Sequence, residues 1–526
     1  MKSLGLKNIR SFKNSGLIDL APITLLLGQN SSGKSTFLRT FALFKQALGV
    51  RAREPFLWVG ELVDFGGFSE TISKFADENS VSVTIKFDTF LDALLETSRA
   101  VFNRQLPQDS RITEFTVSIT EYGPRNNGCL ESFGYDFHFD GNEISFELNA
   151  DGTFERFEIN GQSGVELVKD WLGVREWNGP IPTFTRLASS ESFGSGATAD
   201  LKKQRKTYLE TVIDFVGQRM DGRSREERHR DVAYRLLRSS IHSLLAVAQS
   251  DDIGDATWRR AAANWNEDSA EFKKLKNIVI GTRFPEITAH IFDYFESALE
   301  NIKYVSPLRA SAERYYRKQG LAVNELDPTG KNFALFLDNM SAGERYSFSK
   351  WTRDFFGISI QTSSEQGGHL SLLLRSSEDN SKEFNMADTG FGFSQMFPIL
   401  AQLWAIQNKR VGRKNGGRIA PVIFAIEQPE LHLHPRLQAQ LADVFVSAIV
   451  AARAKKIDIR VIVETHSEYL VNRLGSLIGT GKIASKDASV LIFEKNKFSS
   501  PTDIRHSDFS EKGFLRNWPH GFFEPV

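Results

Sequence analysis

Hydrophobic and polar residues alternate along most of the first third of the chain. Segments such as SVSVTIKFD, TEFTVSITEYG and NEISFELNADG have a period of two and are separated by Asp-Gly and Asn-Gly type turn signals. Such alternation is typical of antiparallel hairpins with one buried face. Residues 1–173 are therefore predicted to form a lobe of short, mostly antiparallel strands, interrupted by one helix from Ser35 to about Leu48.

The pattern changes twice further along the chain. From Val174 to Ile302, apolar residues recur at three- and four-residue spacing, in segments such as RKTYLETVIDFVGQRM, which predicts a helical insertion. From Lys303 to the end, apolar strands such as VIFAIE and IDIRVIVETH alternate with helical segments. That alternation indicates parallel strands with crossover helices. The sequence thus divides into residues 1–173, 174–302 and 303–526.

Composition excludes several classes of protein. Lys+Arg and Asp+Glu are each 65, so the net charge is zero and the whole molecule has no strong attraction for nucleic acid or anionic membrane. The single cysteine, Cys129, excludes a disulfide framework and multi-cysteine metal sites. No apolar run approaches the roughly 18 residues that span a bilayer, and the N-terminus lacks the apolar core of a signal peptide. We therefore expect a cytoplasmic protein that does not contact a membrane.

A glycine-rich segment, GQNSSGKST, lies between the apolar strand ITLLL and a helix and fits the pattern G-x-x-x-x-G-K-[ST]. Glycines in such a loop let backbone N–H groups surround phosphate oxygens, and the helix N-terminus adds its dipole. The lysine supplies positive charge, and the first hydroxyl after it is a ligand for Mg²⁺. The segment predicts a site for ATP and Mg²⁺ formed by Gly28, Asn30, Ser31, Ser32, Gly33, Lys34, Ser35 and Thr36.

A phosphate loop of this kind needs an acidic residue at the end of a neighbouring apolar strand to help hold Mg²⁺. The best candidate is Glu427, which ends the strand VIFAI within PVIFAIEQPELHLHP. Roughly 390 residues separate it from the loop, so the nucleotide-binding domain is split by insertions, which add little loop entropy.

These segments resemble a known group of proteins. The split phosphate loop, IEQPELHLHP and the strand-end histidine of VIVETHSEYL resemble the ABC-type ATPases of the RecF/SMC class. More narrowly, the chain resembles the OLD-like AAA ATPases of bacterial anti-phage defence systems, including Septu and retron systems. SPLR, DTGFGFSQMFPIL and WPHGFFE share in the resemblance, whereas the middle helical stretch does not. It implies an α/β fold: an ABC-type split P-loop NTPase domain with an antiparallel β lobe and an inserted helical domain.

The resemblance also implies roles for individual residues. Glu427 corresponds to the Walker B acid that serves Mg²⁺ together with Ser35. Gln428 stands where ABC ATPases usually have a catalytic glutamate, and an amide can orient water but cannot accept its proton. Glu430 is the spare carboxylate nearby, so either it or Gln428 positions the water. His466 matches the switch histidine that contacts the γ-phosphate.

Two more segments complete the implied site. LHLHP lies where ABC proteins carry their D-loop, which places His434 near a dimer interface and leaves a metal site at His432 and His434 as the weaker interpretation. The signature segment has two candidates. We choose ADTGFGFSQ, which opens an apolar helix, over MSAGERYSF, which we interpret as an ordinary helix start. The chosen signature residues are Gly390, Gly392, Ser394 and Gln395. No Q-loop glutamine is found at the usual place, where DFGGFSE stands instead.

Positive charge gathers in one region of the otherwise neutral chain. Eleven Lys and Arg residues lie between Lys202 and Arg238. They form either a surface for nucleic-acid phosphates or a solvated helix face with internal ion pairs. Arg309, in SPLR, either reaches phosphate or braces the site. The basic residues of the run are Lys202, Lys203, Arg205, Lys206, Arg219, Arg223, Arg225, Arg228, Arg230, Arg235 and Arg238.

The leading hypothesis is the ATPase subunit of an anti-phage defence complex. The resemblance implies a homodimer or higher oligomer that closes around ATP and controls a separate effector, most simply a nuclease. The alternative is a DNA-repair ATPase of the RecF/SMC class that clamps DNA. A self-contained nuclease is disfavoured, because the sixty residues after His466 contain no Asp-x-Asp pair for metal-dependent cleavage.

Overall fold

The computed structural model describes residues 1–52, 54–91, 112–123, 132–169, 172–186, 208–253, 255–320, 322–323, 325–377, 382–408, 421–497 and 499–517. Several predicted features lie outside these residues. They are Cys129, the Ser- and Gly-rich loop of residues 189–200, the lysines and arginine at 202–206, and the segment WPHGFFE.

A mainly parallel sheet forms the nucleotide-binding part of the fold, and the two ends of the chain build it together. Its strand order is β13-β18-β19-β3-β20-β21, with only β21 antiparallel. The acidic strand β18 is therefore separated from the phosphate-loop strand β3 by one strand, β19. The strands are β3 (Ile23–Gly28), β13 (Ile302–Val305), β18 (Val422–Glu427), β19 (Ile459–Glu464), β20 (Ala488–Glu494) and β21 (Asp503–Asp508).

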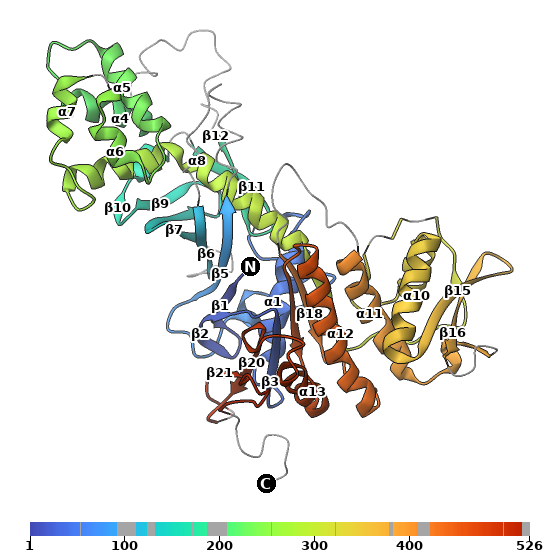
Figure 1. The fold of residues 1–526 in the computed structure, drawn as a ribbon. Helices are drawn as coiled ribbons and strands as arrows, with labels where there is room; N and C mark the ends of the chain where they lie inside the picture. The colour runs from blue at the N-terminus through green and yellow to red at the C-terminus, as the bar shows by residue number, and fades with distance from the viewer. Residues whose placement is uncertain are drawn as a thin grey trace.

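Both faces of this sheet are buried, as expected for parallel strands. Leu26 packs on the same side as helix α1 (Lys34–Ala47), whereas Leu25 and Leu27 face the opposite core. That second core also includes side chains of α11 (Phe391–Asn408), α12 (Pro435–Ala454) and α13 (Glu468–Gly479). Helix α1 is thus enclosed between the parallel sheet and the antiparallel lobe (Figure 1).

Among the described residues, α12 is the only helix long and apolar enough to cross a membrane. Its side chains Leu441, Phe445 and Ile449 are buried in the core that covers one face of the parallel sheet. Its apolar character is accounted for by that packing.

The antiparallel lobe has the strand order β10-β9-β8-β7-β6-β5-β1-β2. A smaller sheet, β12-β11-β4, lies beside it. The strands are β1 (Ser3–Ile9), β2 (Phe12–Asp19), β4 (Arg51–Ala52), β5 (Ser80–Leu91), β6 (Ile112–Tyr122), β7 (Ser132–Phe139), β8 (Asn142–Asn149), β9 (Phe154–Ile159), β10 (Gln162–Ser163), β11 (Leu172–Asn178) and β12 (Ile181–Arg186), and a short helix, α2 (Phe68–Thr71), follows β4.

The predicted helical insertion begins later than expected. Residues 172–186 form the hairpin of β11 and β12, so the boundary drawn at residues 173 and 174 is wrong. The Trp177 indole N–H donates to the Tyr135 hydroxyl at 3.0 Å, which fixes this hairpin onto the antiparallel lobe. The described helices of the insertion are α4 (Tyr208–Gly217), α5 (Glu226–Arg238), α6 (Leu244–Gln249), α7 (Ala256–Ala262) and α8 (Ala270–Glu300).

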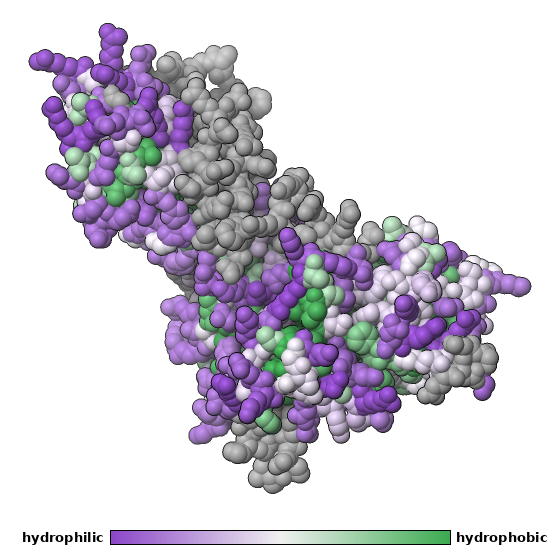
Figure 2. Space-filling view, viewed as in Figure 1, coloured by the Kyte–Doolittle hydropathy of each residue, from purple (hydrophilic) through white to green (hydrophobic). Residues whose placement is uncertain are grey.

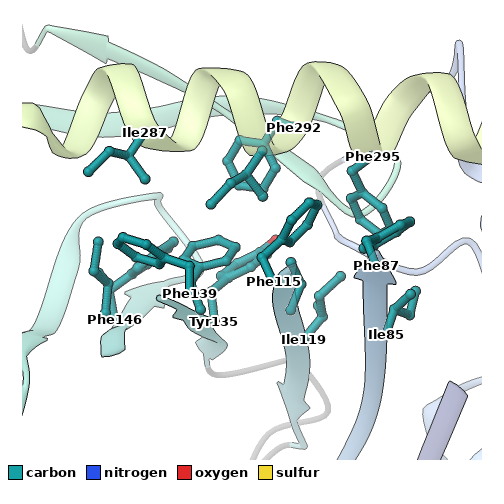
Figure 3. Packing of buried hydrophobic residues seen from close by; sticks show 14 of the residues in the cluster. Ile85, Phe87, Phe115, Ile119, Tyr135, Phe139, Phe146, Ile287, Phe292 and Phe295 are labelled. Carbon is teal, nitrogen blue, oxygen red and sulfur yellow. The ribbon is translucent and has the colours of Figure 1, made fainter. Parts of the chain in front are cut away.

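Helix α8 runs from this helical region back along the antiparallel sheet (Figure 1). Ile287, Phe292 and Phe295 point from α8 toward the aromatic face of the sheet, where Phe87 and Phe115 are stacked with ring centroids 4.9 Å apart (Figure 3). Offset and edge-to-face aromatic contacts of this kind add to the burial of large apolar areas. Phenylalanines from both elements therefore join α8 to the sheet.

A further antiparallel unit projects beside α11 on the opposite side of the molecule (Figure 1). It consists of α9 (Phe333–Asn339), α10 (Ala342–Phe356), β14 (Tyr316–Arg317), β15 (Ile358–Glu365), β16 (His369–Ser376) and β17 (Glu383–Asn385). Short 3-10 turns complete the described chain at Val165–Leu167, Asp251–Ile253, Met386–Asp388 and Ser485–Asp487. The predicted fold class is confirmed: an α/β, ABC-type split P-loop fold with an antiparallel lobe and a helical insertion.

Candidate functional site

The phosphate loop connects β3 to α1, as predicted, and two of its glycines are required by geometry. Gly33 has φ +98°, and a Cβ there would lie 2.5 Å from the Ser11 hydroxyl. Gly28 has φ +149°, and a Cβ there would lie 2.4 Å from the carbonyl oxygen of Phe493. The Thr502 hydroxyl donates to the Ser32 carbonyl at 2.8 Å and holds the loop from outside. Only glycine permits this curvature, which is the backbone conformation that a phosphate-binding loop requires.

Lys34 is buried within the loop that it serves. Its ammonium donates to the carbonyl oxygens of Gly28 at 2.9 Å and Gln29 at 2.8 Å. Burial lowers the pKa of Lys34, while the nearby carboxylates Glu464 and Glu430 act in the opposite direction. A phosphate group is a stronger acceptor than these two carbonyls, so Lys34 has a reason to exchange partners when nucleotide binds.

A pocket of about 430 Å³ opens over the loop. Two of its serine hydroxyls, those of Ser11 and Ser32, are buried without a hydrogen-bond partner in the structure. Unsatisfied buried donors beside a ring of loop N–H groups fit an anionic ligand such as a nucleotide phosphate. The described residues that line the pocket are Arg10, Ser11, Asn30, Ser31, Ser32, Gly33, Lys34, Ser35, Thr36, Gln428 and Glu464.

Glu427 lies at the end of β18, as predicted, but its carboxylate is fully engaged. Arg39 donates to it through two nitrogens, each at 2.8 Å, and the Tyr304 hydroxyl donates at 2.6 Å. Arg39 is on α1, and its pKa is raised mainly by the hydrogen bond to Glu427. Glu427 is only 2% exposed, and it is not one of the described residues that line the pocket.

Glu464 ends the next strand, β19, and faces the phosphate loop. The Ser35 hydroxyl donates to its Oε1 at 2.9 Å, and its Oε2 has no hydrogen-bond partner in the structure. Burial raises the pKa of Glu464 to about 7. The Ser35 hydroxyl and this carboxylate form an all-oxygen pair, and oxygen ligands are those that Mg²⁺ prefers. The pair therefore fits a magnesium ion.

Gln428 and Glu430 continue from β18 into the same region. Gln428 has φ +41°, and its N–H donates to the Glu464 carbonyl at 2.8 Å. Glu430 accepts the His466 backbone N–H at 2.7 Å, and burial raises its pKa. Partial desolvation and the charge of Lys34 lower the pKa of His466. Of the predicted water-positioning residues, Gln428 lines the pocket, whereas Glu430 is not among the described lining residues and holds the backbone of His466.

Arg309 holds the backbone of this region through hydrogen bonds. Its guanidinium donates to the backbone carbonyls of Gln395 and Gln428, each at 3.0 Å, and it is 7% exposed. Burial lowers the pKa of Arg309 to about 10. The Gln395 amide in turn donates to the Arg309 carbonyl at 3.2 Å. The structure therefore gives both side chains a bracing position, which answers the question left open for Arg309.

The other signature residues lie at the start of α11. The Ser394 hydroxyl donates to the Phe391 carbonyl at 2.8 Å, and a Cβ on Gly392 would meet the His432 carbonyl at 3.1 Å. Gly390 has open space around it, with no atom within 4 Å of a built Cβ. None of these residues lines the phosphate-loop pocket of the same chain in the part that the structure describes. The rival segment MSAGERYSF forms a capping box at Ser341 and starts α10, as expected for an ordinary helix start.

The histidines of LHLHP are accounted for without a metal ion. His434 is the N-cap of α12, and its ring nitrogen accepts the Arg436 N–H at 3.3 Å. His432 has φ +62° and lies beside the Phe391 ring. Within the described ranges, no cluster of three or more His, Cys, Asp or Glu residues could hold a metal ion.

Sequence analysis missed several residues that form or border this site. Glu464 stands directly before the recognised Thr-His pair at the end of an apolar strand, which is the same signal that identified Glu427. Arg39 lies four residues after Ser35 and therefore on the same helix face. Arg10 lines the pocket, and its guanidinium lies 4.3 Å from the Phe65 ring centroid. Arg10 thus connects the pocket to DFGGFSE, the segment found where a Q-loop was expected.

The basic run is largely occupied by internal contacts where the structure describes it. Arg230 forms an ion pair with Glu226 at 2.8 Å, and Arg219 lies over the Phe215 ring and pairs with Glu271. Arg235 donates to the Asp252 carbonyl, and Arg228 lies 3.9 Å from Asp255. Figure 2 shows a mainly hydrophilic surface over α4 to α7. These contacts match the interpretation as a solvated helix face.

Part of the chain matches a known family model. Residues 261–471 match the family described as AAA ATPase domain. The match spans less than half of the 526 residues and leaves out the phosphate loop, but it includes Glu427, Gln428, Glu430 and His466. No curated protein matches the chain. With its phosphate loop and the matched ATPase domain, the chain is an ATPase, as the sequence predicts.

Solved structures of Smc head domains align along nearly the whole chain. The Pyrococcus furiosus head domain with an extended coiled coil, bound to the C-terminal domain of ScpA, has 12% identity and a TM-score of 0.34, covering 96% of this chain and 95% of that chain. The head domain of Pyrococcus yayanosii has 12% identity and a TM-score of 0.33, covering 97% and 98%. The head domain of Thermotoga maritima has 9% identity and a TM-score of 0.33, covering 96% and 97%. TM-scores this low do not establish a common fold. The fold is defined by the strand order of the parallel sheet.

Proposed function

We propose that the chain is an ATP-dependent switch that pairs with a second copy around ATP and Mg²⁺ and thereby controls a separate effector protein. One observation carries the pairing. The phosphate-loop pocket is lined by the loop, Gln428 and Glu464, while residues 390–395 lie elsewhere at a helix start. A second copy would supply Gly390 and Gly392 to the nucleotide, while Gln395 keeps its contacts with Arg309, and His434 would then lie near the shared interface.

The residues of one copy have separate tasks in this proposal. The loop N–H groups and Lys34 hold the phosphates, and Ser35 is the hydroxyl ligand of Mg²⁺. A bound Mg²⁺ would supply positive charge that neutralises the phosphates, and Ser35 with its partner Glu464 would hold it. Gln428 orients water without taking its proton, and Glu430 fixes His466 beside Lys34. A site with an amide in the usual place of a carboxylate is suited to slow or partner-dependent hydrolysis.

The role of the switch is the finer part of the proposal. The motifs IEQPELHLHP and VIVETHSEYL support an OLD-like ATPase of an anti-phage defence complex, whose effector is a nuclease. The alternative, a RecF/SMC-class repair ATPase that clamps DNA, draws on the same motifs and on the basic run. The internal contacts of Arg219, Arg228 and Arg230 give that alternative no added support.

Pairing can be tested by measuring molar mass in solution with ATP and Mg²⁺, and with ADP. The wild-type chain should double in mass with ATP only. Gly390→Glu fits locally because the position is open, and its carboxylate would repel a phosphate of the second copy. This variant should bind ATP with unchanged affinity and remain a monomer. An ATP-dependent dimer of Gly390→Glu would contradict the proposed use of residues 390–395.

The biological role needs a separate test. Bacteria that express the chain with its neighbouring genes should resist phage infection in a plaque assay, and Lys34→Ala should remove the protection. Resistance to DNA damage with no effect on phage would favour the repair alternative instead.

A further inference from the structure

Two acidic residues end neighbouring strands of the parallel sheet, and their surroundings are opposite. Glu427 of β18 and Glu464 of β19 are partners in the strand register. Both side chains are buried, at 2% and 4% exposed. Sequence analysis chose Glu427 as the acid that serves Mg²⁺, because it ends the apolar strand VIFAI within PVIFAIEQPELHLHP. The contacts of the two carboxylates reverse that preference.

The Glu427 carboxylate is saturated by protein groups. Two N–H donors of Arg39 and the hydroxyl of Tyr304 point at its two oxygens. A two-nitrogen contact between arginine and carboxylate is strong and fixed in geometry. Its partners belong to α1 and β13, so the cluster ties the helix after the phosphate loop to the edge of the sheet. The positive charge of Arg39 offsets that of this carboxylate, so Glu427 attracts a further cation less than an unpaired carboxylate would.

The Glu464 carboxylate is in the opposite condition. One oxygen accepts the Ser35 hydroxyl hydrogen, and the other has no hydrogen-bond partner although it is buried. Glu464 also lines the phosphate-loop pocket. A buried carboxylate oxygen without a partner is unfavourable, and a nearby cation would remove that cost.

We propose that Glu464, and not Glu427, is the carboxylate that positions Ser35 for Mg²⁺. By accepting the hydroxyl hydrogen, Glu464 turns the oxygen lone pairs of Ser35 toward the pocket. It also places a negative charge beside the bound cation. Outer-shell carboxylates that orient a metal ligand in this way typically change metal affinity by roughly 10- to 100-fold. The inference rests on the proposed nucleotide site but is tested separately from it.

The test measures the affinity of a fluorescent ATP analogue, with excess EDTA and with excess MgCl₂. In Glu464→Gln, affinity in MgCl₂ should fall, and the gain caused by Mg²⁺, taken as the ratio of the affinities in MgCl₂ and in EDTA, should fall roughly 10- to 100-fold. Glu427→Gln represents the competing assignment. It should keep the Mg²⁺-dependent gain but unfold at lower temperature, because Arg39 loses its charged partner.

A double-mutant cycle tests whether Glu464 acts through Ser35. Ser35→Ala should reduce the Mg²⁺-dependent gain, and adding Glu464→Gln should reduce it little further, because the two side chains form one contact. Additive losses would overturn the positioning role. Thermal unfolding without nucleotide shows that each variant is folded, and Tyr304→Phe supplies a milder disruption of the Glu427 cluster if Glu427→Gln is unstable.

The outcomes separate the two proposals. If the wild-type chain binds the analogue and Glu464→Gln keeps the whole Mg²⁺-dependent gain, the role of Glu464 is overturned while the nucleotide site stands. A loss of the gain in folded Glu427→Gln or Tyr304→Phe would return the role to Glu427. If the wild-type chain does not bind the analogue at all, both proposals fall.

Discussion

The two large sheets of this molecule bury acidic residues for different reasons. In the parallel sheet, Glu427 and Glu464 lie at strand ends, beside the phosphate loop and the cations Arg39 and Lys34. In the antiparallel lobe, Glu121 of β6 accepts a hydrogen bond from the Trp58 indole N–H at 3.0 Å. Its second oxygen has no hydrogen-bond partner in the structure.

Burial alone does not identify a functional acid, because Glu121, Glu427 and Glu464 are all buried. An acid at the carboxyl end of a parallel strand faces loops and helix starts, where ligands bind to α/β sheets. Glu121 instead lies beside Trp58 and away from the phosphate loop, where the burial of its carboxyl group costs stability. The parallel sheet should therefore respond to substitution mainly through nucleotide binding, and the antiparallel sheet mainly through stability.

The largest expected effect belongs to the parallel sheet. Lys34→Ala should weaken ATP binding roughly 100-fold or more, since the charge and the hydrogen bonds that Lys34 would give to phosphate are lost. The exposed Lys350→Ala, on α10, is the matched control and should bind normally. Isothermal titration with ATP and Mg²⁺ measures both, and thermal unfolding without nucleotide checks that the fold is kept. Unchanged ATP affinity in Lys34→Ala would mean that the nucleotide site is elsewhere.

Glu430 tests whether an acid of the parallel sheet works by its charge or by its shape. Because Glu430 accepts the His466 N–H, Glu430→Gln should keep most of the turnover, since an amide oxygen can accept the same bond. Glu430→Ala should lower turnover by about tenfold or more while ATP affinity changes little. Steady-state phosphate release measures both variants.

The contrary result would be equally informative for Glu430. A general base is typically worth roughly 10²- to 10⁴-fold in rate. If Glu430→Gln loses activity as completely as Glu430→Ala, the carboxylate itself accepts the proton, and a role for Glu430 limited to holding His466 would be wrong.

In the antiparallel lobe, substitution should change stability rather than nucleotide binding. Phe295 of α8 is fully buried, with its ring centroid 5.4 Å from Phe87 and 6.1 Å from Phe44 of α1 (Figure 3). Phe295→Ala should lower the free energy of unfolding by about 3–5 kcal/mol. Phe514→Ala, at a side chain 70% exposed, should change it by less than about 1 kcal/mol. Urea unfolding compares the two, and equal effects would show that α8 is not joined to the sheet through this ring.

Much of the fold follows from the sequence because the local patterns agree with the tertiary arrangement. The phosphate loop, the apolar strands around it and the alternating strands of the first lobe all form where their patterns predict. The hairpin of β11 and β12 was assigned to the helical stretch, although Asn178-Gly179 is a turn signal, because its strands are short and gain their stability from contacts such as Trp177 with Tyr135.

The chemistry of the site was less accessible from the sequence. Two acids, Glu427 and Glu464, stand at ends of similar apolar strands, and sequence patterns cannot show which one meets Ser35. That contact joins residues 429 positions apart. The saturation of Glu427 likewise depends on Arg39 and Tyr304, which come from two other elements of the fold. The tertiary arrangement of β18, β19, α1 and β13 therefore decides which acid meets Ser35 and which acid is held by Arg39 and Tyr304.

Removing Glu121, the buried acid of the antiparallel lobe, should stabilise the protein. Burial raises the pKa of Glu121 to about 8 from a usual value of 4.5, so the folded chain keeps a proton that the unfolded chain releases. Stability is therefore lost as pH rises from about 4.5 to about 8, and the penalty is constant above that range.

Glu121→Gln removes this penalty and keeps an acceptor for Trp58. The variant should match the wild type at pH below about 4.5 and gain on the order of a few kcal/mol at pH above about 8. The exposed Glu61→Gln should show no such gain. Thermal unfolding across this pH range gives the comparison, and a pH-independent difference would exclude ionisation of Glu121 as its cause.

The smallest effect is expected outside both sheets, on α5. Arg228, Arg230 and Arg235 already contact acidic side chains or a carbonyl, so their joint replacement by Gln should change neither the affinity for nucleic acid nor its dependence on salt. Exposed helix ion pairs are worth only about 0.3–0.5 kcal/mol each, so stability should change little as well. Each phosphate contact contributes about 0.9 to the slope of log affinity against log salt concentration. A slope reduced by two or three in fluorescence-anisotropy titrations of a DNA duplex would therefore show that these arginines exchange their internal partners for phosphate, and α5 would become a nucleic-acid surface.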